Sequence, residues 1–220
     1  MNYTDLVNEV LIRMREDTVD SIGGNRLTIT DDPVVDIVKL AINDAKRLVE
    51  DSHTWNALRH DWTFTSVAGT HTYPLTGAGN YGTIDTVYSS NGTELRNVSL
   101  SYIHKKSAQQ PANNTPMYFA ANGVDSNGDL SIRLFNTPKA SLTYTVHGFK
   151  RTPELDTDSD KLIVPSKPVI YMAFALASRE RGEAGGAQSS ELFAMAEQYL
   201  KDAIALDCAN SDLDNDWNVR

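Results

Sequence analysis

Apolar residues recur at helical spacing near both ends of the chain. The first such pattern follows Thr4, a candidate N-cap, and covers residues 6–14. The second follows Asp32 and Pro33, a capping carboxylate and a proline at the first helical position, and continues to about Leu58. The N-terminal end of the chain therefore predicts two helices, of which the second is the longer.

The second predicted helix has an apolar side and a polar side. Val34, Val38, Ala41 and Ala45 belong to the apolar side. The polar side, which we expect to face solvent, carries Asp36, Lys39, Asp44, Lys46 and Arg47. This amphipathic pattern predicts a helix that packs against other elements along one side only.

Helical spacing returns near the C-terminus. Ser166 is the candidate cap of a segment from about Lys167 to Arg181, which is apolar nearly all round between residues 169 and 177. A last helix is expected after Ser189 or Ser190, with one apolar row made of Leu192, Ala196, Tyr199, Ala203 and Leu206. Residues 207–220 are expected to form a polar tail.

The spacing of apolar residues changes between the two helical parts. Residues 62–67 and 71–75 alternate in polarity and predict a hairpin, and residues 83–88 and 93–100 predict a second hairpin around Asn91-Gly92. Three more strands are expected over residues 117–121, 129–135 and 141–149. Seven or so short strands favour a small antiparallel β-sandwich or a barrel-like module.

These patterns predict an α+β fold. Residues 1–61 and 152–206 should form an α-helical bundle frame, because each terminal part carries apolar faces too broad for solvent. Residues 62–151 should form a β module inserted into that frame, and residues 207–220 a tail.

Composition argues against only a few functional classes. The 220 residues carry a formal net charge of −9, which argues against binding nucleic acid by neutralising phosphates. Cys208 is the one cysteine, so no internal disulfide can form. The first residues lack the basic and apolar regions of a signal peptide, and no apolar run is long enough for a membrane span.

The motifs of common catalytic and metal sites are missing. The five histidines include no His-Glu-x-x-His motif, and His53 and His60, seven residues apart, lack a nearby third ligand. The alternating carboxylates of residues 156–160 are followed by Lys161, where a calcium loop of the EF-hand type needs glycine. Neither a Gly-x-Ser-x-Gly elbow nor a phosphate-binding P-loop occurs. We therefore expect a protein that is not an enzyme and holds no metal or cofactor.

Two stretches carry a resemblance to a known family. In the first, Trp55-Asn56-Ala57-Leu58 leads into residues 61–65 and then 68–75, which end in Tyr-Pro-Leu. In the second, Pro153-Glu154-Leu155-Asp156 precedes Leu162-Ile163-Val164-Pro165, a buried helix and residues 196–200. This order resembles the head-to-tail adaptor (connector) proteins of tailed phages, including the tail tubular proteins of short-tailed phages.

The resemblance implies a structural virion protein, assembled in the host cytoplasm. It would be one subunit of a dodecameric ring that joins the portal protein to the tail or nozzle protein. Genomic DNA would pass through the lumen without sequence-specific binding. A helix that is apolar nearly all round could use a neighbouring subunit as one of its covers. The candidate residues for this subunit interface are Val169, Met172, Phe174 and Tyr199.

C-terminal extensions in this family can reach into the portal, and a polar segment with one aromatic anchor is typical of folding on binding. The candidate portal-binding residues are Asp207, Asp212, Asp214, Asp216 and Trp217. A disordered end is the alternative interpretation of the same segment.

Three other functions are alternatives. The β module could bind a carbohydrate or a receptor through exposed tyrosines, which would have to lie on one face. An unmarked pair of carboxylates could hydrolyse cell-wall sugars. The chain could also be another head- or tail-completion protein, which only its partner would distinguish from an adaptor.

Overall fold

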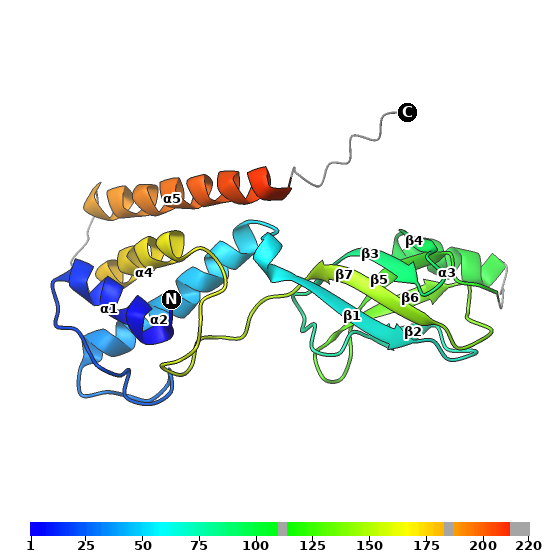
Figure 1. Ribbon diagram of the computed structural model, residues 1–220, viewed down its shortest axis with the longest axis horizontal. Coiled ribbons are helices and arrows are strands. Elements are labelled where there is room, and N and C mark those ends of the chain that lie inside the picture. The colour runs from blue at the N-terminus through cyan, green and yellow to red at the C-terminus, as the bar shows by residue number, and fades with distance from the viewer. Residues whose placement is uncertain (110–113, 183–186, 212–220) are drawn as a thin grey trace. The chain divides into compact units, whose positions relative to one another are not determined.

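The computed structural model describes residues 1–109, 114–182 and 187–211, and it divides the chain into two compact units. One unit comprises Met1–Ala57 and Thr152–Arg220, and the other comprises Leu58–Arg151. Figure 1 shows helices in the first unit and a twisted sheet with one helix in the second. The α+β fold class predicted from the sequence is confirmed. We call the two units the helical frame and the β module.

The helical frame begins with α1 (Tyr3–Met14) and α2 (Pro33–Ser52). The N-cap of α1 is Asn2, not the predicted Thr4, because the Asn2 side chain accepts a hydrogen bond from the Asp5 amide and the Asp5 carboxylate accepts one from the Asn2 amide. Asp32 caps α2 as predicted, by accepting a hydrogen bond from the amide of Val34.

Helix α2 differs from its prediction at its end and on its polar side. It stops at Ser52, where extended His53 leads to the short 3-10 helix η1 (Asn56–Leu58), although its spacing predicted a helix to Leu58. Of the residues expected in solvent, Lys39 and Lys46 are buried. They are covered because the loop after α1 and the segment after the β module pack on this side of α2, where backbone oxygens accept hydrogen bonds from both ammonium groups.

The frame is completed by α4 (Ser166–Glu180) and α5 (Ala187–Ser211). Pro165 precedes α4, and no side chain makes a capping hydrogen bond there, so the predicted cap by Ser166 is wrong. Helix α4 packs against α1, α2 and α5, whereas α5 packs chiefly against α4. Helix α5 continues to Ser211, beyond the predicted end of the apolar pattern.

The β module is a seven-stranded mixed sheet that forms a nearly closed barrel. Its strand order is β1-β7-β3-β4-β5-β6-β2. The strands are β1 (Arg59–Thr65), β2 (Thr72–Pro74), β3 (Thr83–Ser89), β4 (Glu94–Asn97), β5 (Tyr118–Val124), β6 (Leu130–Phe135) and β7 (Thr143–Phe149). The inward side chains form one core, which includes Trp62, Tyr73, Val87, Phe119, Ile132 and Val146. The sheet therefore closes around its own apolar side chains.

One predicted pairing of the β module is confirmed and two predicted features are wrong. The hairpin β3–β4 forms around Asn91-Gly92 as predicted, and β5–β6 forms a further antiparallel pair. However, β1 pairs with β7 and β2 with β6, so the first predicted hairpin does not exist. The β4–β5 pair is parallel, which makes the sheet mixed rather than antiparallel.

A helix within the β module was not predicted. Strand β4 ends at Asn97 rather than at the expected Leu100, and α3 (Leu100–Gln109) follows, in a part of the chain for which neither a helix nor a strand was predicted. Ser99 starts this helix, because its hydroxyl and carbonyl oxygens accept hydrogen bonds from the amides of Tyr102 and Ile103. Ile103 packs α3 onto the outer side of β5 and β6.

Candidate subunit interface

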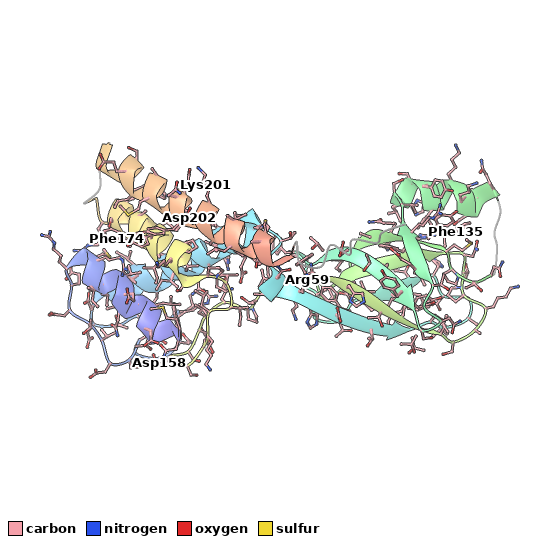
Figure 2. All side chains as sticks on the ribbon, turned by 45° about the horizontal axis from the view of Figure 1, so that its top comes forward. Arg59, Phe135, Asp158, Phe174, Lys201 and Asp202 are labelled. Atoms are coloured by element: carbon pink, nitrogen blue, oxygen red, sulfur yellow. The ribbon has the colours of Figure 1, made fainter. Side chains whose placement is uncertain are left out.

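Helix α4 is the central element of the helical frame. Its Val169 is fully buried, and Met172 and Phe174 are half-buried. Three helices of the same chain surround α4, which explains why its sequence is apolar nearly all round. The candidate interface residues on α4 are therefore largely covered within the chain, and Figure 2 labels Phe174 at this position.

Helix α5 is attached to α4 by aromatic and cationic contacts. The rings of Tyr171 and Tyr199 stack with centroids 4.4 Å apart. The Lys167 Nζ atom lies 5.8 Å from the centroid of Tyr199, and the Arg179 guanidinium lies 5.3 Å from the centroid of Phe193. Hydrogen bonds with Tyr199 and Arg13 lower the pKa of Tyr171 below its ordinary value. Tyr199, a predicted interface residue, thus contributes to the α4–α5 contact.

The C-terminal end of α5 is fixed to the end of α2. The Asp207 carboxylate lies 3.2 Å from His53 Nε2 and accepts a 3.1 Å hydrogen bond from the Asn56 amide. The Asn56 side chain also donates to the Asp207 carbonyl oxygen. Asp207, a predicted portal-binding residue, is therefore engaged inside the helical frame, and the remaining four candidates, Asp212, Asp214, Asp216 and Trp217, lie outside the described residues.

The rest of α5 is poorly covered. Among its described side chains, over residues 190–209, Ala196 alone is buried. Met195 is 44% exposed, and Leu206 is 70% exposed although it belongs to the predicted apolar row of this helix. Figure 1 shows α5 along one side of the frame, next to α4. With one buried side chain over residues 190–209, this helix leaves apolar surface available for another molecule.

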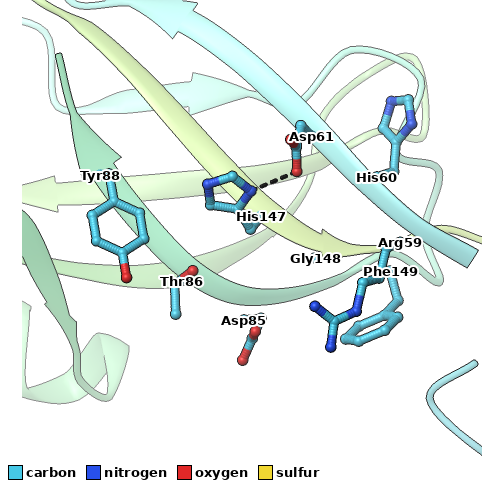
Figure 3. Close-up of a pocket in the computed structure, with 9 residues that line it drawn as sticks. All are labelled: Arg59, His60, Asp61, Asp85, Thr86, Tyr88, His147, Gly148 and Phe149. Atoms are coloured by element: carbon cyan, nitrogen blue, oxygen red, sulfur yellow. Dashed lines mark hydrogen bonds and ion pairs between the residues drawn. The ribbon is translucent and has the colours of Figure 1, made fainter. Parts of the chain in front are cut away.

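The β module carries a polar pocket of about 730 Å³ on the outer side of β1, β7 and β3 (Figure 3). Across it, His147 Nδ1 and Asp61 Oδ1 are 2.6 Å apart, and Tyr88 meets the imidazole edge-on at 5.7 Å. The Arg59 guanidinium lies 5.7 Å from the centroid of Phe149. These residues share a surface because they alternate with the core residues on three neighbouring strands.

The pocket orients one imidazole without completing a catalytic arrangement in the described part of the chain. There, the hydrogen-bond partner of His147 is Asp61, and no hydroxyl or thiol group is bonded to its Nε2 atom. Nor does any group of three or more His, Cys, Asp or Glu side chains within residues 1–109, 114–182 and 187–211 form a metal site. The pocket is therefore a polar surface, and its geometry assigns no reaction to it.

Comparison with known proteins gives one result over the whole chain. The family described as SU10 adaptor protein matches residues 1–220. A search of curated proteins found no match. In the described residues, no helix is long and apolar enough to cross a membrane.

Proposed function

We propose that this chain, which belongs to the SU10 adaptor protein family, is a ring subunit that links the portal to the tail of a phage virion. The family is one of structural adaptors, consistent with the absence of catalytic motifs in the sequence. In the proposed ring, genomic DNA passes through the lumen without sequence-specific contacts.

The observation that carries the ring proposal is the uncovered surface of α5. In the single chain Met195 is 44% exposed and Leu206 is 70% exposed, whereas α1 buries Tyr3, Leu6, Val7, Val10, Leu11 and Met14. Covering exposed apolar side chains on a second copy removes that surface from water, at roughly 25 cal/mol per Å². Contacts of this kind between unlike faces close into a ring when the rotation permits.

Portal binding is assigned to the segment after α5. Asp212, Asp214, Asp216 and Trp217 combine charge with one aromatic anchor, a composition suited to ordering on a partner. Because Asp207 is bonded to His53 and Asn56, deletion should begin at residue 212. A variant lacking residues 212–220 is expected to keep its fold and lose portal binding, as measured by co-sedimentation with portal rings.

Assembly itself is tested by the mass in solution. Purified chain, alone and mixed with its portal, is expected to form closed rings in electron micrographs and an oligomer by light scattering. Leu206→Glu should reduce the assembled fraction, because it places a charge on the exposed part of α5. Leu48→Glu, at a 51% exposed position of α2, is the matched control. A chain that stays monomeric under both conditions would refute the ring.

A further inference from the structure

The charge of the chain is divided unequally between its two units. The β module, Leu58–Arg151, holds eight Lys and Arg and five Asp and Glu, a net charge of +3. The remaining twelve Lys and Arg and twenty-four Asp and Glu give the other residues a net charge of −12. The overall net charge of −9 is therefore the sum of a positive β module and a negative remainder of the chain.

Three of the eight Lys and Arg side chains of the β module, Lys105, Lys106 and Arg133, belong to α3 or to β6, which packs against it. Residues 95–124 contain no Asp or Glu, and neither do residues 130–151. Helix α3 packs against β5 and β6, and its His104 Nε2 lies 3.2 Å from Arg133 Nη1. Burial and the nearby Arg133 lower the pKa of His71. The stretches of chain that form this surface thus contribute basic groups and no carboxylates.

The same surface has apolar and aromatic parts. Tyr102 is 37% exposed and lies edge-on to Tyr118, with ring centroids 5.8 Å apart. Met117, next to Tyr118 in the chain, is 56% exposed. We define the α3 face as the surface formed by Tyr102, His104, Lys105, Lys106, Met117 and Arg133.

The outer side of α5 has the complementary character. It carries Glu191, Glu197 and Asp202 with the single cation Lys201, and Figure 2 labels Lys201 and Asp202 on this helix. Lys201 Nζ lies 3.8 Å from a carboxylate oxygen of Glu197, so it offsets one of these charges locally. We define the α5 face as these charged residues together with exposed Met195 and Leu206.

From this complementarity, and resting on the ring proposed above, we propose that the α3 face of one copy binds the α5 face of the neighbouring copy. Two helical frames placed against each other would bring like charges together, because each is strongly acidic. A basic face against an acidic one, each with exposed apolar side chains, favours association and fixes its direction. The contact joins unlike surfaces, as a head-to-tail ring requires.

Reversing the charge of each face tests the contact. Lys105→Glu with Lys106→Glu makes the α3 face acidic, and Glu197→Lys with Asp202→Lys makes the α5 face basic. All four side chains are exposed or half-exposed, so unfolding temperatures close to wild type are expected and should be verified. Each double variant alone should need about tenfold more protein for half-assembly, measured by light scattering.

Mixing the two double variants gives the decisive result. The acidic α3 face of the first variant then meets the basic α5 face of the second, and the reverse pair is also attractive. Assembly should return toward the wild-type level in the equimolar mixture and in the single chain that carries all four changes. Lys105→Glu and Lys139→Glu change the net charge equally, yet the Lys105 change alone should weaken assembly, because exposed Lys139 lies outside both faces.

The outcomes separate this contact from the ring itself. If wild-type protein forms rings and the charge reversals do not alter assembly, or are not rescued on mixing, the contact between the α3 and α5 faces is refuted and the ring stands. Wild-type protein that forms no ring refutes both. If Lys105→Glu instead abolishes binding to a short DNA duplex by fluorescence anisotropy and leaves assembly unchanged, the α3 face binds nucleic acid and the contact is refuted.

Discussion

Two lysines inside the helical frame, Lys39 and Lys46, are 0% and 1% exposed. Lys39 Nζ donates to the carbonyl oxygen of Thr28 at 2.7 Å and lies 2.9 Å from an Asp36 carboxylate oxygen. Lys46 Nζ donates to the Thr152 carbonyl oxygen at 3.0 Å and lies 3.2 Å from Glu50 Oε1. A buried ammonium group is tolerated only with such partners, so these pairs position the two segments that cover α2.

Removing one member of a buried pair should be costly. Lys46→Met leaves the buried Glu50 carboxylate without its cationic partner, and we expect a loss of about 3 kcal/mol or more in the free energy of unfolding. Replacing both members, Lys46→Met with Glu50→Leu, should lose less, because no charge stays buried. Urea unfolding of both variants measures the difference, and an equal or larger loss in the double variant would contradict this account.

At the scale of elements, features that depend on adjacent residues were predicted correctly, whereas pairings between distant segments were not. The Asn91-Gly92 hairpin and the start of α2 depend on residues adjacent in the chain, and both are confirmed. The pairing of β1 with β7 depends on barrel closure. The burial of Lys46 on α2 depends on the segment that follows the β module in the chain and begins at Thr152. No local signal encodes those contacts.

The candidate interface shows the same limit. Helical spacing identified α5 and its apolar residues, but periodicity cannot tell which of two apolar sides packs within the chain. Leu206 was therefore placed in the predicted apolar row although it is exposed. The α3 face was missed because its helix lies where no helix or strand was predicted and because its charge was averaged into the total.

The pairing of β3 with β7 depends on one residue without a side chain. A Cβ atom at Gly148 would collide with the carbonyl oxygen of Thr83 and touch the ring of Trp62. Gly148→Ala should therefore separate these strands and lower the free energy of unfolding by roughly 3 kcal/mol. Gly123→Ala is the control, since it meets no atom and costs about 1 kcal/mol through its positive φ alone. Equal losses of thermal stability in the two variants would contradict the predicted collision at Gly148.

At the scale of the whole molecule, the opposite charges of the two units predict that assembly depends on salt concentration. An assembly held partly by contacts between the basic α3 face and the acidic α5 face should weaken as ionic strength rises, because counterions screen exposed charges. From ~50 mM to ~500 mM NaCl, the concentration for half-assembly should rise about tenfold. Light scattering across a salt series measures this. Assembly that strengthens with salt would indicate an interface dominated by apolar contacts.

The helical frame is assembled from two segments that the β module separates in the chain. Asn43 Nδ2 donates to the Leu155 carbonyl oxygen, and the Leu155 amide donates to Asn43 Oδ1, which joins the segments directly. During synthesis, α1 and α2 leave the ribosome before the strands and long before α4. The continuous β module can fold first, whereas the frame must wait for the last helices. Nascent chains therefore expose the apolar side of α2 until translation is nearly finished, and this exposed surface is prone to aggregation in that interval.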